Sequence, residues 1–261
     1  MPNVPSASGL ARRDQIRREA ARLFAARGFL GVGVDEIGKA VGISGPGLYR
    51  HFAGKDAMLA DLLVGISERL LEEGRRRAGG SEGPAAALDA LIGGHVDFAL
   101  DDRDLITLHD RELLNLRDED RRTVRRLQRA YVELWVEVVR QACPPLAAPT
   151  AEPVARAAVH AVFGLINSTP HSHGPNPGQG DERAGLTRDA MAALLHDLAH
   201  GAFSAAADSV ADGNALGNPG AAAPATPADA ADAAPATPAD AADAAPIADL
   251  AGADAADVAR A

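Results

Sequence analysis

Two short helical segments joined by a glycine-containing turn constrain this chain more than any other feature of its sequence. Residues 35–41 carry apolar side chains on one side of a helical pattern. Gly42 ends this segment, Ser44 is a good N-cap residue, and Pro46 suits the first turn of a second helix. We therefore predict helices over 35–41 and 45–52 that form a helix-turn-helix.

The second of these helices would enter the major groove of DNA. Its N-terminal residues would approach the duplex closely, and the polar side chains that follow offer donors to phosphates or base edges. A lysine at the start of the next helix favours phosphate, because its charge and the helix N-terminus both attract anions. The candidate DNA-binding residues are Ser44, Gly45, Pro46, Gly47, Tyr49, Arg50, His51 and Lys55. Leu48 and Phe52 are expected in the core, whereas the glycines flanking Pro46 have no evident packing role.

The charge of the chain is unevenly distributed. The net charge is −10. Residues 1–60 hold nine Lys and Arg against five Asp and Glu, a net charge of +4 that leaves −14 for the remainder. A basic head on an acidic body suits a protein that meets phosphate at one end only.

Helical periodicity covers most of the chain up to about residue 206. Alanine is abundant and aromatic residues make up only 3% of the sequence, a composition that favours an all-α fold. Further helices are predicted over 10–27, 55–77, 85–101, 103–116, 118–142, 152–168 and 186–205.

The last part of the chain has a different character. The stretch AAPATPADAAD at 222–232 repeats at 233–243, and such Ala/Pro/Asp sequence has almost nothing to bury. We therefore predict a disordered tail over 207–261. The remainder divides into a helix-turn-helix domain at 10–70, with its motif at 33–52, and a helical domain at 71–206.

An ordered set of residues within the first seventy positions resembles the TetR/AcrR family of transcriptional regulators. The set is Gly28-Phe29, Val34-Asp35-Glu36-Ile37, the run from Val41 to Phe52, and Lys55-Asp56-Ala57-Met58-Leu59. The resemblance implies a three-helix DNA-binding head, a helical body for ligand binding and dimerisation, and a homodimer that represses from a palindromic operator. It also implies phosphate contacts from Tyr49, His51 and Lys55.

The chain departs from this family pattern at the entrance to the helix-turn-helix. The family commonly has hydroxyl residues at the positions of Val32 and Gly33, where they cap the second helix and touch phosphate. Gly33 can still act as a weak N-cap, so the fold is expected to stand without that phosphate contact.

Polar and aromatic residues inside otherwise apolar helical patterns are candidates for an effector pocket. They are His95, Phe98, His109, Arg111, Asn115, Tyr131, Trp135, Phe163 and Asn167. For each residue alone, core packing or a solvated face is the simpler interpretation, and Arg103 or Arg111 could meet an anionic ligand. The body resembles family members that respond to acyl-CoA thioesters or other hydrophobic molecules. The helices at 152–168 and 186–205 are predicted to pair with their symmetry mates in a four-helix dimer interface.

Histidines raise an alternative, a metal-responsive regulator. His196 and His200 stand at i and i+4 on one predicted helix face, a spacing that can bind zinc, although residue 197 is Asp and not the Glu of HExxH. A second pair, His171 and His173, lies in a predicted loop. Surface or interface histidines are the simpler interpretation, so no metal is expected.

The sequence has no signature of an enzyme. It lacks a Gly-rich phosphate loop, a GxSxG elbow and a usable Cys–His pair. Cys143 is the single cysteine, no apolar run is long enough for a membrane span, and no signal peptide is evident. We expect a non-enzymatic cytoplasmic protein that uses no cofactor and does not engage a membrane.

Overall fold

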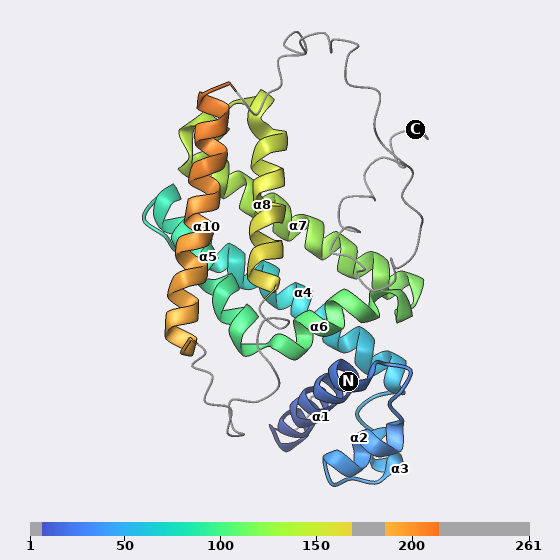
Figure 1. Ribbon diagram of the computed structural model, residues 1–261. Coiled ribbons are helices and arrows are strands. Elements are labelled where there is room, and N and C mark those ends of the chain that lie inside the picture. The colour runs from blue at the N-terminus through green and yellow to red at the C-terminus, as the bar shows by residue number, and fades with distance from the viewer. Residues whose placement is uncertain (1–6, 169–185, 214–261) are drawn as a thin grey trace, which may run out of the picture. The chain divides into compact units, whose positions relative to one another are not determined.

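The computed structural model describes residues 7–168 and 186–213, and these residues form helices and turns with no strand among them. The prediction of an all-α fold is confirmed (Figure 1). The described α-helices are α1 (Ala7–Arg27), α2 (Val34–Ala40), α3 (Gly45–Leu48), α4 (Lys55–Gly79), α5 (Pro84–Asp101), α6 (Arg103–Glu112), α7 (Asp118–Ala142), α8 (Glu152–Asn167) and α10 (Arg188–Ala211). Short 3₁₀ turns are η1 (Leu113–Asn115), η2 (Pro144–Leu146) and η3 (Pro149–Ala151).

The head consists of α1, α2, α3 and the first half of α4, and Figure 1 shows its first three helices together at one end of the described residues. It packs around large apolar side chains that are at most 1% exposed, among them Ile16, Phe24, Ile37, Leu48 and Leu59. Three residues from later parts of the chain complete the same cluster, namely Leu108 of α6, Val124 of α7 and Leu116 between these helices. The head is therefore fixed on the rest of the chain by shared apolar packing.

Helix α4 belongs to two hydrophobic cores. Its first half places Met58, Leu59 and Leu63 in the core of the head, and its second half places Leu71 in the larger core that follows. The 25 residues of α4 therefore form one continuous connection between the two cores.

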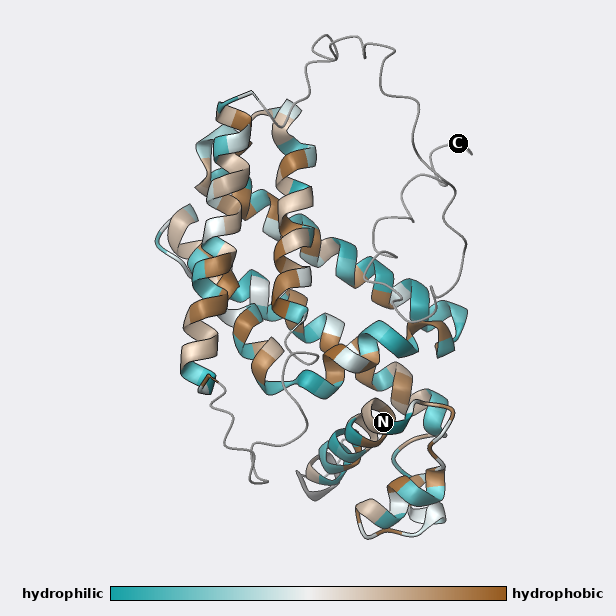
Figure 2. Ribbon diagram, in the orientation of Figure 1, coloured by the Kyte–Doolittle hydropathy of each residue, from teal (hydrophilic) through white to brown (hydrophobic). Residues whose placement is uncertain are grey.

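The body is the remaining set of helices, with α5, α7, α8 and α10 around the second core. Trp135 is fully buried there, and Val159 and Phe203 reach it from α8 and α10 with at most 1% exposure. Figure 2 shows apolar residues along α8 and α10, whereas the N-terminal part of α7 is mostly hydrophilic. This pattern fits the amphipathic periodicity read from the sequence.

Some predicted boundaries were wrong. Helix α3 ends at Leu48, and residues 49–51 continue as turns in which the N–H of His51 donates to the carbonyl of Leu48 at 2.9 Å. The helix predicted over 103–116 is α6 followed by η1.

The tail was predicted to begin at 207, but α10 continues to Ala211. Ala207 extends the buried stripe of Phe203 by one turn, so the apolar pattern that holds the helix runs further than the sequence suggested. Residues 214–261, where most of the predicted disordered tail falls, lie outside the described residues.

Candidate DNA-binding and effector sites

The segment at residues 44–51, here named the recognition turn, is held in place by a helix cap and by buried side chains. The Ser44 hydroxyl accepts a hydrogen bond from the Gly47 N–H at 3.3 Å, which is the N-cap predicted from the sequence. Leu48 is fully buried and Phe52 is 4% exposed, so both anchor the turn in the core as expected. Tyr49 is 57% exposed and Arg50 is exposed, so both side chains are accessible to a partner.

Two glycines lie at close contacts within the helix-turn-helix. A Cβ atom on Gly38 would lie 2.9 Å from the carbonyl oxygen of Ile43, and one on Gly45 would lie 2.8 Å from a carboxylate oxygen of Asp35. The neighbour of Gly38 is backbone that cannot move without opening the turn, whereas the carboxylate that faces Gly45 ends a flexible side chain that can rotate away.

Lys55 has partners within the protein. Its ammonium donates to the carbonyls of Phe29 at 3.0 Å and Val32 at 3.3 Å, and lies 4.5 Å from the centre of the Phe29 ring. These contacts hold the loop between α1 and α2 against the start of α4. A phosphate contact by Lys55 remains a prediction, and it would have to coexist with these bonds.

Arginines of α1 also hold the head together. The guanidinium of Arg13 lies 4.2 Å from the centre of the Phe52 ring and donates to the His51 carbonyl at 2.9 Å. Arg13 and Arg17 both bind the carboxylate of Asp61 on α4. Burial alone would raise the pKa of Asp61, but the hydrogen bonds from Arg17 and Arg13 outweigh it and hold that pKa below its usual value.

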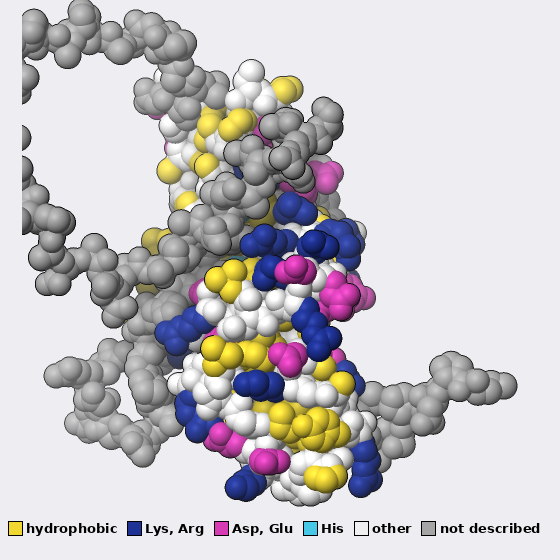
Figure 3. Space-filling view, turned by 90° about the vertical axis from the view of Figure 1, so that its right-hand side faces the viewer, with side chains coloured by type: hydrophobic (Ala, Val, Ile, Leu, Met, Phe, Trp, Pro, Cys, Tyr) yellow, Lys and Arg dark blue, Asp and Glu magenta, His cyan; other side chains and the backbone are white. Residues whose placement is uncertain are grey.

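Other basic side chains lie at the surface of the described residues. Figure 3 shows Lys and Arg side chains over one face, interspersed with acidic ones. The arginines of the N-terminal half of α7 are exposed or half-buried; they are Arg121, Arg122, Arg125, Arg126 and Arg129. Arg121 pairs with Asp118, which fits the solvated face expected for this segment.

Glu112 connects the head to the body. Its carboxylate is 6% exposed and accepts the backbone N–H of Phe29 at 3.1 Å through one oxygen. The other oxygen accepts the side-chain amide of Asn115 at 2.6 Å. A buried carboxylate at the end of α6 therefore satisfies a backbone group of the head loop.

Five of the candidate pocket residues and Asn167 come together. Rings of His95, Phe98, Tyr131, Trp135 and Phe163, here named the aromatic core, make contacts with centroid distances between 4.7 and 6.1 Å. The Tyr131 hydroxyl lies 3.4 Å from Nδ1 of His95. Burial lowers the pKa of His95 to about 4, and the neighbouring Asn167 amide acts in the opposite direction.

Three polar atoms of this region are buried and have no partner in good hydrogen-bond geometry among the described residues, although the Asn167 side chain lies close enough to His95 to influence its pKa. They are Nε2 of His95, Nε1 of Trp135 and Oδ1 of Asn167. Such atoms are uncommon in folded proteins, because leaving a polar atom unpaired costs free energy.

The other three pocket candidates lie elsewhere. His109 contacts Gln128 of α7, Arg111 is exposed, and Asn115 binds Glu112. None of them has a ring or hydrogen-bond contact with the aromatic core among the described interactions. Two surface grooves lie between α7 and the start of α8 and beside the start of α4. Neither groove is lined by any of the pocket candidates.

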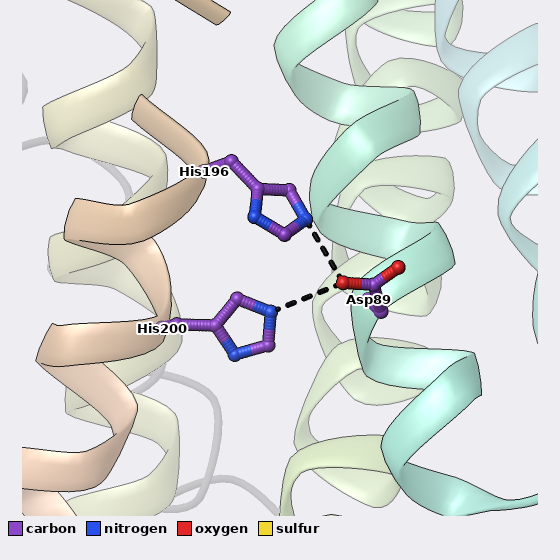
Figure 4. Close-up of side chains that lie close together, drawn as sticks. All are labelled: Asp89, His196 and His200. Carbon is purple, nitrogen blue, oxygen red and sulfur yellow. Dashed lines mark hydrogen bonds and ion pairs between the residues drawn. The ribbon is translucent and has the colours of Figure 1, made fainter. Parts of the chain in front are cut away.

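His196 and His200 meet a carboxylate that sequence reasoning did not find (Figure 4). Both point from α10 toward Asp89 of α5, with their Nε2 atoms 3.0 Å and 3.4 Å from the same oxygen, Oδ1. The three side chains are 30%, 39% and 62% exposed in that order. The other pair, His171 and His173, lies outside the described residues.

Comparison with known proteins defines the class to which this fold belongs. Residues 16–62 match the family described as bacterial regulatory proteins of the tetR family, and residues 81–171 match the tetracyclin repressor-like C-terminal domain. The chain belongs to the TetR family of transcriptional regulators.

Individual relatives agree with this assignment. The chain is 29% identical over 140 residues to the HTH-type transcriptional repressor KstR2 of Rhodococcus jostii, covering 53% of this chain and 69% of the relative. The structure of a TetR-family regulator from Bordetella parapertussis superposes with a TM-score of 0.60 at 25% identity, covering 72% of this chain and 93% of the other. AibR in complex with isovaleryl coenzyme A and operator DNA shares the fold, with a TM-score of 0.58, 19% identity, and coverage of 72% and 97%.

The matched family, KstR2 and the Bordetella parapertussis protein are all described as transcriptional regulators. Within the described residues, no helix combines the length and the apolar character needed to cross a bilayer.

Proposed function

We propose that this protein is a transcriptional repressor that binds a palindromic operator as a homodimer and leaves it when a hydrophobic effector binds the body. The observation that carries the DNA-binding part is the recognition turn. It is fixed from below by the Ser44 cap and by Leu48, and it presents Tyr49 and Arg50 to solvent. Two such turns in a dimer would reach successive major grooves about one DNA turn apart.

Selection of DNA fragments by the purified full-length protein tests this part of the proposal. We expect enrichment of a duplex with two half-sites related by a dyad, bound with an affinity that falls steeply with salt. Failure to enrich any specific duplex would contradict the assignment of an operator-binding role. The Arg50→Ala variant should lose enrichment, whereas Arg75→Ala, an exposed arginine on the second half of α4, should keep it.

The effector is proposed to enter the aromatic core. Its apolar part would replace ring contacts such as the Tyr131–Phe163 stack, and its carbonyl or hydroxyl group would pair with the unsatisfied atoms of Trp135 and Asn167. The printed names of similar proteins suggest effectors of this kind. AibR is described with isovaleryl coenzyme A, and KstR2 of Mycobacterium tuberculosis is described as a ketosteroid transcriptional regulator; its structure has a TM-score of 0.57 at 19% identity.

The emission of Trp135, the chain's single tryptophan, reports on this core directly. Titration with acyl-CoA thioesters of increasing chain length, and with a ketosteroid, should change that emission for one class and release operator DNA over the same concentration range. We expect Phe163→Ala to weaken the response and the exposed Arg111→Ala to leave it unchanged. Equal binding in both variants would place the effector elsewhere.

The proposed dimer uses α8 and α10. Leu194 and Leu198 of α10 are 42% and 45% exposed. They form an apolar surface whose contact with water is unfavourable. Pairing with the same face of a second copy would cover it. The Leu194→Glu and Leu198→Glu double variant should therefore sediment as a monomer and lose operator binding, and a stable dimer would exclude this face.

The metal-responsive alternative retains one specific observation in its favour. His196 and His200 share Asp89 as a neighbour, which gives the pair a third potential ligand.

A further inference from the structure

We propose that Asp89, His196 and His200 form a zinc site that fastens α10 to α5. The sequence contains the histidine pair but does not connect it with Asp89, because the carboxylate lies more than a hundred residues earlier. In the folded chain the three ligand atoms lie within 4.8 Å of one another. Such a site is independent of the effector proposed for the aromatic core.

The distances suit a tetrahedral ion. Zinc holds imidazole nitrogen and carboxylate oxygen at roughly 2.0–2.2 Å, which places neighbouring ligand atoms about 3.3–3.5 Å apart. The two nitrogen-to-oxygen distances are 3.0 Å and 3.4 Å, so two edges of the ligand triangle are close to the required length. The three ligand atoms all lie within 4.8 Å of one another, and the side chains are partly exposed, so they have room to rotate toward a shared ion.

The chemistry of the donors favours zinc over the common hard cations. Two imidazoles and one carboxylate suit Zn²⁺, whereas Mg²⁺ and Ca²⁺ prefer oxygen ligands only. Without metal, each Nε2 that donates to Oδ1 carries its proton. When zinc binds, that proton moves to Nδ1 through solvent, and the Nε2 lone pair faces the ion. Three protein ligands would leave a fourth position for water.

The position of the cluster gives the site a structural consequence. Helices α5 and α10 run in opposite directions along a shared seam, because Arg188 at the start of α10 pairs with Asp97 and Asp101 at the end of α5. Asp89, near the start of α5, and the two histidines of α10 join the same two helices further along this contact. Zinc would therefore fix the proposed dimerisation helix to the helix that carries His95 of the aromatic core.

Isothermal titration of the metal-free full-length protein with ZnCl₂ tests the proposal, with MgCl₂ as the hard-cation comparison. We expect one zinc per protomer, a higher thermal unfolding midpoint with zinc, and no response to magnesium. His196→Ala and His200→Ala should each abolish zinc binding. Asp89→Asn should lower the zinc affinity by at least roughly 10–100-fold, the loss that is typical when a residue that only supports a ligand is changed.

The matched control is Asp97→Asn, which alters the same seam without removing a ligand and should bind zinc as the parent does. A second control, the His171→Ala and His173→Ala double variant, removes the other histidine pair and should also bind normally. The proposal is overturned if the parent binds no zinc, if Asp89→Asn binds with unchanged affinity, or if binding is lost in the His171 and His173 variant and retained in His196→Ala.

Discussion

The backbone N–H of Phe29 in the head donates to the buried carboxylate of Glu112 in the body at 3.1 Å. The next residue back, Gly28, has a positive φ of 74°, a conformation that glycine adopts readily and that turns the chain toward α6. The loop that precedes the helix-turn-helix is thus held by a residue of the proposed effector-binding body. Movement at the end of α6 would be transmitted to the head at this contact.

Removing this carboxylate should destabilise the protein. In Glu112→Ala the Phe29 N–H would remain buried without an acceptor, at a cost of about 1–3 kcal/mol. Urea denaturation should show the lower unfolding free energy, and operator affinity in the same variant should become less sensitive to effector. Glu72→Ala, an exposed glutamate on α4, is the control and should stay within about 0.5 kcal/mol of the parent.

Substitutions at Tyr49 and Lys55 should differ in their effects on operator affinity and on the free energy of unfolding. Tyr49→Phe removes only an exposed hydroxyl, so unfolding should be unchanged while operator affinity falls by roughly 1–3 kcal/mol for the lost contact. Lys55→Ala removes two hydrogen bonds to head carbonyls and should lower the unfolding free energy as well. Urea denaturation and fluorescence anisotropy with the selected operator measure the two effects. A Lys55→Ala protein of parental stability would show that its internal bonds are dispensable.

Burial of His95 should make stability depend on pH. Its pKa is about 4 in the folded protein, below the usual 6.5, so unfolded chains take up the proton first as the pH falls. The neutral side chain therefore contributes fully above pH 6.5, and that contribution is lost between pH 6.5 and 4, by up to ~3 kcal/mol. Urea denaturation at several pH values should give a shallower decline for His95→Gln than for the parent. Parallel curves would show that another group controls this range.

Two glycines of α4 should respond oppositely to alanine. A Cβ on Gly74 would lie 2.8 Å from a ring carbon of Tyr131 and 3.1 Å from Leu134, so Gly74→Ala should cost about 1–3 kcal/mol by overpacking. Gly65 has nothing within 4 Å of an added Cβ, so Gly65→Ala should stabilise the helix by about 0.5–1 kcal/mol. Thermal unfolding of the two variants beside the parent measures both signs. A stabilised Gly74→Ala protein would mean that α4 and α7 separate easily.

Helical periodicity carries local information, and it does not show which distant segments contact one another. It predicted the helices and the Ser44 cap, because caps, glycines and apolar spacing are local signals, although it extended the second helix of the motif beyond Leu48. It grouped His95 with His109, since periodicity gives the face of a helix and not the helix against which that face packs. Glu112 and Asp89 were missed for the same reason: each is a charged residue whose partner comes from a distant segment. A charge in the sequence is ordinarily read as exposed, and only the fold reveals that Glu112 is buried.

The length of the continuous helix α4 determines how far a movement in the body would displace the head. Its 25 residues span roughly 37 Å, so a tilt of about 5° at one end displaces the other by about 3 Å, close to the rise of one base pair. Near the middle, the buried Ser67 hydroxyl donates to the carbonyl of Leu63 at 2.7 Å, a bond of the kind that often bends helices. Under the proposed function, a small rotation in the body would move the two recognition turns of a dimer out of register with the major grooves.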